Sequence, residues 1–288
     1  MTTRALVLGG GGPVGIAWET GLIAGLAEAG VHLGRADWIL GTSAGSVVGA
    51  QLAMDRDPAA MLKTEFANAQ TAKAAQASGG GKAPDLMPLM SVFARRPPGQ
   101  PMPTELMREL GQISLNGQTV SEEVFIAGFG AMADLDQPWP ERYACTAVDT
   151  ATGEFQLWTK DTAAPLGRGV ASSCSVPAIF PAITIEGRRY MDGGMRSGTN
   201  ADLARDHGKV VTIAVMPPSF APMMLPSLER EMEVIREAGS EALLLVPDAA
   251  CGEAFGTNLM DSGNREAIAR AGFVQGQAEA ARVKAFWG

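Results

Sequence analysis

The spacing of apolar residues along the chain predicts alternating strands and helices. Four short, mostly apolar runs are each followed closely by glycine or proline, which is typical of strands buried on both faces of a parallel sheet; they span residues 4–8, 38–40, 209–215 and 242–246. Longer helical segments are predicted over residues 16–29, 58–77, 104–112, 119–133, 225–238 and 264–286. Turn-forming pairs predict two hairpins, which join residues 143–148 to 154–158 and 183–185 to 189–191.

This order of elements predicts an α/β protein with three layers, α/β/α, around a mostly parallel central sheet. We expect a single domain over residues 1–288, in which 57–134 form a helical cap insertion over the carboxyl edge of the sheet and 217–288 supply a C-terminal strand and helices. A flexible break is expected at 78–82, and short turns and loops through the proline-rich stretch that follows. Methionines in this insertion suit a pocket that adapts to flexible acyl chains, although filling of gaps in a loosely packed cap explains them equally well; they are Met87, Met90, Met102 and Met107.

Composition and charge narrow the classes of partner. Apolar residues make up 46% of the 288 residues, and the formal net charge is −8 with a pI near 4.9. Such a surface repels phosphate backbones, which argues against nucleic acid, and any peripheral membrane contact would rest on apolar surface. The three cysteines are scattered and form neither a disulfide framework nor a metal site. No apolar run is long enough to span a bilayer, and the position of the first predicted strand leaves no room for a signal peptide. We therefore expect a cytoplasmic protein.

The strongest chemical motif is Gly41-Thr42-Ser43-Ala44-Gly45, which follows the strand at 38–40 and precedes a helix of small residues. A sharp strand-to-helix turn of the form Gly-x-Ser-x-Gly lifts a serine hydroxyl clear of its neighbours, as a nucleophile requires. Glycine at both flanks avoids collisions with the adjoining strand and helix. The same motif also arises by chance, as a glycine turn around a helix-capping serine, so it does not establish catalysis alone.

A second glycine-rich loop follows the first predicted strand. Gly10-x-Gly12-x-x-Gly15 satisfies the dinucleotide fingerprint, but that site needs an acidic residue at the end of the second strand, and Asp37 instead precedes this strand. The alternative is an anion site made of backbone N–H groups at a helix N-terminus. Because the loop and the serine turn both lie at the carboxyl edge of the sheet, nucleophile and oxyanion donors would be neighbours, as acyl transfer requires.

A serine nucleophile needs a base, and the histidines are poorly placed for that role. His32 and His207 each precede a strand, whereas Ser43 follows one, so in a parallel sheet they lie at the opposite edge. Asp192 follows a strand and is trailed by Gly193 and Gly194; its alternative interpretation is an ordinary turn aspartate. A carboxylate with its usual pKa of ~3.9 is a poor base at neutral pH, but burial beside the serine would raise that pKa. We take a Ser43–Asp192 dyad as the working hypothesis.

These motifs together resemble the patatin-like phospholipases, over roughly residues 4–206. The resemblance is carried by three glycine motifs in order and by a stretch before the aspartate: Gly10-x-Gly12-x-x-Gly15, Gly41-x-Ser43-x-Gly45, Asp192-Gly193-Gly194 and Ala171-Ser172-x-x-x-x-Pro177-x-x-Phe180-Pro181. It implies a patatin-like fold and a serine–aspartate dyad, with roles that fall to Ser43 and Asp192. It also implies an oxyanion hole at Gly10, Gly11 and Gly12, and no metal or other cofactor.

The chain departs from the family pattern at one position. Many members carry Arg or Lys just before the last glycine of the first motif, where this chain has Val14. A neutral lipid, a soluble ester or a thioester is therefore favoured as substrate over an anionic phospholipid. The function predicted is hydrolysis of lipid acyl esters through an acyl-enzyme; the alternatives are a transacylase or thioesterase that uses the same dyad, and a non-catalytic acyl-binding protein.

Overall fold

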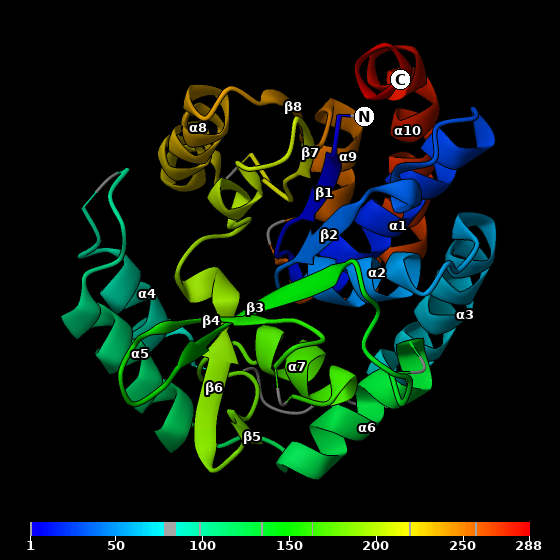
Figure 1. Ribbon diagram of the computed structural model, residues 1–288. Helices are drawn as coiled ribbons and strands as arrows, with labels where there is room; N and C mark the ends of the chain where they lie inside the picture. Colours follow the sequence, from blue (N-terminus) through cyan, green and yellow to red (C-terminus); the bar gives the residue numbers. More distant parts are fainter. Residues whose placement is uncertain are drawn as a thin grey trace.

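The computed structural model describes residues 2–77, 85–97, 99–133, 135–162, 164–218, 220–256 and 258–288. Helices cover both faces of a central sheet, so the predicted three-layer α/β/α fold is confirmed (Figure 1). The break predicted at 78–82 lies outside the described residues.

The sheet has eight strands in the order β5-β6-β3-β2-β1-β7-β8, with β4 paired to β3. The strands are β1 (Arg4–Leu8), β2 (Trp38–Gly41), β3 (Tyr143–Asp149), β4 (Phe155–Trp158), β5 (Ile183–Ile185), β6 (Arg188–Asp192), β7 (Lys209–Ile213) and β8 (Glu241–Leu245). Strands β3, β2, β1, β7 and β8 pair in parallel, whereas β4, β5 and β6 pair antiparallel. The sheet is therefore mixed, with a parallel centre, and both predicted hairpins are present.

The helices divide between the two faces according to the alternation of buried side chains along the strands. Leu6, Leu8 and Ile39 face a layer that contains α1 and α2, while Val7 and Leu40 face α8. The helices are α1 (Gly12–Glu28), α2 (Ala44–Ala53), α3 (Pro58–Ala77), α4 (Met87–Phe93), α5 (Thr104–Asn116), α6 (Glu122–Ala133), α7 (Leu166–Ser173), α8 (Ala221–Glu237), α9 (Ala249–Phe255) and α10 (Arg265–Trp287). Figure 1 shows α1, α2, α3 and α10 together on one side of the sheet and α8 on the other.

The helices of the segment expected to form a cap pack against different parts of the molecule. Helix α3 packs on α1 and α10, and α6 packs on α7 and α2. Helices α4 and α5 cover β3 and β6 through Val148 and Met191. In that cluster Met102 and Met107 fill the core, while Met87 and Met90 are exposed, so the four methionines of this segment do not line one acyl pocket.

The local predictions were wrong in three places. Helix α1 begins at Gly12, inside the glycine loop, so the loop is shorter than expected. The start of α6 is capped by the Ser121 hydroxyl, which accepts a hydrogen bond from the Val124 N–H, whereas Thr119 donates to the Val120 carbonyl. Helices α7 and α9 were not predicted, because segments of seven or eight residues rich in small side chains are too short to be recognised from their spacing.

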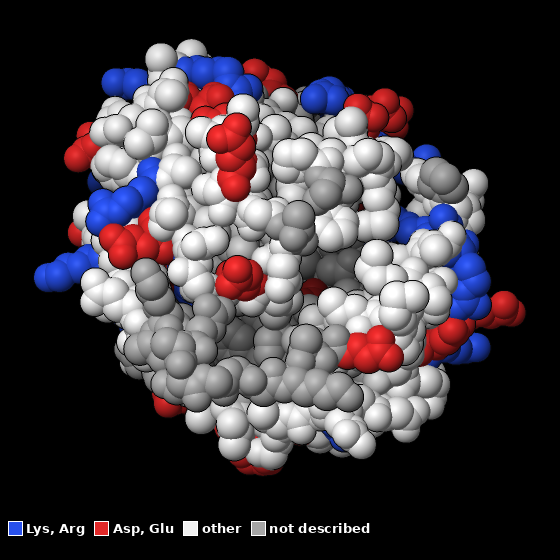
Figure 2. All heavy atoms as spheres, turned by 180° about the vertical axis from the view of Figure 1, so that it is seen from behind, with Lys and Arg blue, Asp and Glu red and all other residues white. Residues whose placement is uncertain are grey.

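The surface carries mixed charge. Figure 2 shows Lys and Arg mostly toward the periphery of one face, with Asp and Glu both there and nearer its middle. None of the helices in the described ranges combines the length and apolarity needed to cross a bilayer.

Helices α1 and α10 approach each other unusually closely, through glycines on both. A Cβ on Gly25 would lie 2.1 Å from the Phe273 carbonyl oxygen, and a Cβ on Gly276 would lie 2.2 Å from that of Leu22. Such distances leave space for hydrogen alone, so the two backbones are in direct contact. Helices α1 and α10 therefore pack tightly against each other in the helical layer below the glycine loop (Figure 1).

Replacement of Gly25 by alanine tests this contact. Because the added Cβ meets backbone rather than a movable side chain, we expect Gly25→Ala to lower the free energy of unfolding by about 1–3 kcal/mol, measured by urea denaturation. Gly167→Ala in α7 is the control, because its Cβ would lie at an ordinary 3.6 Å from its nearest neighbour. Equal effects of the two substitutions would contradict the proposed close contact.

Candidate functional site

The predicted nucleophile Ser43 lies in a strained turn between β2 and α2. Its backbone has φ 52° and ψ −116°, a combination that non-glycine residues rarely adopt. A Cβ on Gly41 would lie 2.4 Å from the Ser46 Cα, and one on Gly45 would lie 2.2 Å from the Leu8 carbonyl oxygen. Glycine is therefore required at both positions for the turn to close, as the motif predicted.

Hydrogen bonds from three directions hold this turn. The Ser43 N–H donates to the Ser173 hydroxyl at 3.0 Å, and the Ser46 hydroxyl donates to the Ser43 carbonyl at 2.6 Å. The Gly45 N–H donates to the Gly9 carbonyl at 2.9 Å. The strained backbone is thus fixed by its surroundings, and the Ser43 side chain remains 7% exposed.

Asp192, the predicted base, lies at the end of β6 and is in contact with Ser43. Its carboxylate accepts a hydrogen bond from the Gly194 N–H at 2.7 Å and lies close enough to the Ser43 hydroxyl for that group to lower its pKa. The residue is 2% exposed, and burial raises the pKa of its carboxyl group from 3.8 to about 7, an effect that these two neighbours only partly offset. A Cβ on Gly193 would lie 2.1 Å from the Thr146 Oγ1, so this glycine lets the turn pack against β3.

The charged neighbours of Asp192 are engaged elsewhere. Arg196 forms an ion pair with Asp202 at 2.6 Å. His32 is exposed, and His207 stacks on Trp38 near the start of β7, at the edge of the sheet opposite to Ser43. Among the described residues, the structure therefore brings a carboxylate, and neither histidine, to the predicted nucleophile.

The glycine loop lies directly beside Ser43. A Cβ on Gly10 would be 3.2 Å from that of Ser43, and one on Gly15 would be 3.0 Å from that of Ala44. The Gly10 N–H is already used, because it donates to the Gly198 carbonyl at 2.7 Å. The N–H groups of Gly11 and Gly12, at the N-terminus of α1, have no acceptor in the described parts of the chain and are free to bind an anion.

A buried polar network that the sequence did not reveal includes residues next to Ser43 and Asp192. The Asn200 amide donates to the Thr42 hydroxyl and to the carbonyls of Gly193 and Ser197, and the Thr42 hydroxyl is 2.9 Å from that of Thr146. This network links the turn that carries Ser43 to the turn that carries Asp192. These residues come from distant segments, so no local motif could have identified them.

An apolar cavity of about 230 Å³ opens beside Ser43. Its walls include Met260, from the segment before α10, and three phenylalanines: Phe125 stacks on Phe180 and meets Phe129 edge to face. The one charged side chain among the described lining residues, Arg265, is neutralised by a buried bidentate ion pair with Glu65 at 2.6 and 2.7 Å. The cavity therefore suits an uncharged hydrocarbon chain.

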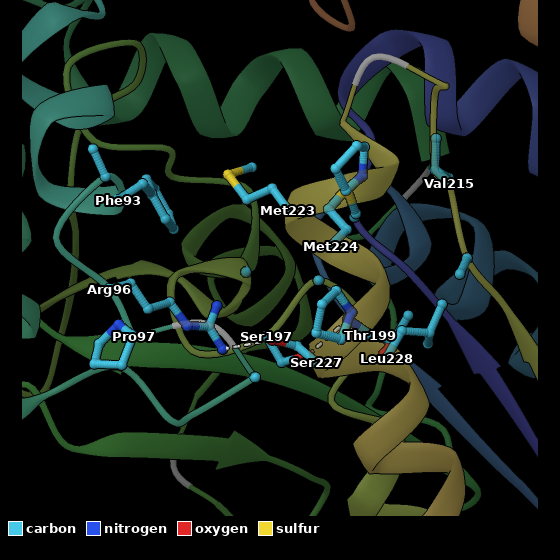
Figure 3. A pocket seen from close by; sticks show the side chains of 18 residues that line it. Phe93, Arg96, Pro97, Ser197, Thr199, Val215, Met223, Met224, Ser227 and Leu228 are labelled. Carbon is cyan, nitrogen blue, oxygen red and sulfur yellow. Dashed lines mark hydrogen bonds between the residues drawn. The ribbon is translucent and has the colours of Figure 1, made fainter.

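A second cavity, of about 400 Å³, begins on the Asp192 side of the glycine loop. Gly10 and Gly194 belong to its lining, which connects it to the dyad. Phe93 and Arg96 enter it from one side and Met223 and Met224 of α8 from the other (Figure 3). The glycine loop thus separates two cavities, because Gly12 belongs to the first and Gly10 to the second.

Glu19 is a buried carboxyl group behind the glycine loop. It is fully buried, and neither carboxyl oxygen makes a hydrogen bond of normal geometry with the described residues. Burial raises the pKa of Glu19 well above 4.5, and the nearby Gly9 backbone lowers this pKa only in part. Burial therefore favours the neutral form of this carboxyl group behind the loop.

The described residues favour neither a dinucleotide nor a metal. Asp37 accepts a hydrogen bond from the Arg4 N–H at the edge of the sheet away from the glycine loop, so it is not placed to bind a ribose. In the described ranges, no three His, Cys, Asp or Glu side chains gather as metal ligands would.

Comparison with known proteins agrees with this geometry. A sequence model described as patatin-like phospholipase matches residues 6–205. The fold is similar to that of VipD from Legionella pneumophila, with a TM-score of 0.50 and 14% identity over 98% of this chain and 67% of that chain. The type III effector protein ExoU aligns with a TM-score of 0.40 and 17% identity over 98% of this chain and 53% of that chain. No curated protein matched the sequence.

The burial of Glu19 predicts a specific pH dependence of stability. Above the pKa that Glu19 has in the unfolded chain, the unfolded chain loses this proton while the folded protein keeps it. The free energy of unfolding therefore falls as pH rises. The total loss is about 1.4 kcal/mol for each pH unit by which folding raises the Glu19 pKa. Glu19→Gln removes this contribution. We expect the stability of the variant relative to wild type to increase as pH rises above about 4.3, measured by urea denaturation.

The matched control is Glu105→Gln on the exposed surface of α5. Its stability relative to wild type is expected to stay constant over the same pH range. A Glu19→Gln difference that does not change with pH would show that Glu19 is ionised in the folded protein.

Proposed function

The chain belongs to the patatin-like phospholipase family, a family of lipid acyl hydrolases, and from this premise we propose that it hydrolyses acyl esters through a Ser43–Asp192 dyad and an acyl-enzyme. The observation that carries the proposal is the position of the Ser43 hydroxyl beside a buried carboxylate whose pKa is raised to about 7. A base with such a pKa accepts a proton far more readily near neutral pH than an ordinary aspartate does.

In the first step the Ser43 oxygen attacks the ester carbonyl carbon while its proton moves to Asp192. The carbonyl oxygen becomes an oxyanion, which the free N–H groups of Gly11 and Gly12 stabilise at the N-terminus of α1. The bond to the leaving oxygen then breaks, and Asp192 returns the proton to that oxygen. Water, deprotonated by Asp192, hydrolyses the acyl-serine and restores the hydroxyl.

The two cavities suggest how an ester lies across the dyad. The acyl chain occupies the phenylalanine-lined cavity, because Ser43 belongs to its wall and an apolar surface favours hydrocarbon. The leaving group must lie within reach of Asp192, which protonates it. It therefore occupies the larger cavity, whose lining includes Gly194, the residue that donates to the Asp192 carboxylate.

Substitution of either member of the dyad tests the chemistry. We expect Ser43→Ala and Asp192→Asn each to lower kcat for a medium-chain ester by about 10⁴-fold, and Ser43→Ala to lose labelling by a fluorophosphonate. Asp202→Asn is the control, because Asp202 pairs with Arg196 and should leave the chemical step unchanged. Retention of full activity by folded Ser43→Ala would exclude the proposed nucleophile.

The pH dependence of activity tests the base. Only ionised Asp192 accepts the serine proton, so kcat/KM is expected to rise with pH, to be half-maximal near the raised pKa of about 7, and to level off above it. The measurement is kcat/KM for an uncharged ester between pH 5 and pH 9. A profile that is flat across this range would contradict the assignment of Asp192 as the base.

A further inference from the structure

The larger cavity contains a cation that the sequence motif lacks. Val14 occupies the position at which the family often has Arg or Lys, yet Arg96, from the segment after α4, lines the cavity that begins at Gly10 of the glycine loop. Figure 3 shows the Arg96 guanidinium in the lower part of the cavity, beside Ser227 of α8. Its Nη2 donates to the Ser227 hydroxyl at 3.0 Å, and its Nε donates to the Gln100 carbonyl at 3.0 Å.

No carboxylate among the described residues forms an ion pair with Arg96. By contrast, Arg95 pairs with Glu109, and Arg196 pairs with Asp202. Burial lowers the Arg96 pKa, and the charge of Glu231 offsets this only in part.

Glu231 is itself committed to other partners. Its carboxylate accepts hydrogen bonds from the Thr199 hydroxyl at 2.5 Å and from the Ala201 N–H at 2.8 Å. Among the described residues, the half-buried Arg96 guanidinium therefore has two neutral hydrogen-bond acceptors, and its remaining N–H donors have none. An unpaired cation in such a setting is stabilised by an anionic ligand, and guanidinium groups bind phosphate particularly well.

The rest of the cavity lining is largely apolar, so Arg96 would contact one defined position of a bound ligand. Phe93, Val215, Met223 and Leu228 contribute to the walls, so a phosphate would meet the positive charge at one position while the linking carbons contact the walls. The cavity begins at Gly10 and Gly194, beside the dyad. A leaving group that starts at the scissile ester would therefore extend toward Arg96.

We propose that Arg96 is a specificity-determining residue that selects esters whose leaving group carries a phosphate. This inference rests on the proposed acyl transfer at Ser43, and it reverses the preference for neutral substrates that Val14 alone suggested. The phosphate could belong to a glycerophosphate ester or to the nucleotide portion of an acyl-coenzyme A thioester, which share the same anionic chemistry.

Two matched substrate pairs test the proposal with the full chain. Octanoyl-glycerol-3-phosphate is compared with octanoylglycerol, and octanoyl-coenzyme A with octanoyl-pantetheine. We expect wild type to prefer the phosphate-bearing member of at least one pair. We expect Arg96→Gln to lower kcat/KM for that member by about ten- to hundredfold, while kcat/KM for the neutral member changes less than about threefold. The pair that responds identifies the source of the phosphate.

Arg95→Gln is the control, because Arg95 precedes Arg96 in the chain, pairs with Glu109 and is not part of the cavity lining. Its substrate preference should match that of wild type. A wild-type enzyme without preference in either pair, or equal losses on both members in Arg96→Gln, would overturn the proposal while leaving acyl hydrolysis intact. Failure of wild type to hydrolyse all four compounds would instead contradict the proposed function.

Discussion

The site depends on the absence of side chains at the turn around Ser43. Because only hydrogen fits between Gly45 and the Leu8 carbonyl, α2 can pack directly against the end of β1. That contact brings the loop after β1 and the turn after β2 side by side, so the free N–H groups at the start of α1 lie near the serine hydroxyl. The strain in the Ser43 backbone is sustained by this packing, and the rest of the site is assembled around it.

A second theme is the burial of carboxyl groups in the absence of compensating cations. Asp192 and Glu19 are both removed from water close to the glycine loop, and both have raised pKa values. Burial disfavours the charged form of each group, which costs stability at neutral pH. At Asp192 the same effect produces a base suited to neutral conditions. The pKa of Glu231, beside the larger cavity, is also raised by burial. These buried carboxyl groups thus lower the stability of the fold at the place where the proposed chemistry occurs.

The sequence predicted the parts of this molecule that are encoded locally. Strand runs, the glycines around Ser43 and the turn after Asp192 each have a short-range physical cause, and the structure brings Ser43 and Asp192 together. The cavity walls could not be predicted, because Met260 and Met223 come from a tail without a recognisable motif. Nor could the sequence show that the Gly10 N–H is occupied, since its acceptor, Gly198, is far away in the chain.

The glycine contact between α1 and α10 has a consequence for the order of folding. Helix α1 carries the glycine loop at its start, yet part of the surface it packs against is made by α10, and Gly25 and Phe273 are separated by most of the sequence. Contacts between such distant segments require the closure of a long loop, so they form more slowly than local contacts do. Formation of the proposed anion site is thus coupled to the docking of a helix from a distant part of the chain.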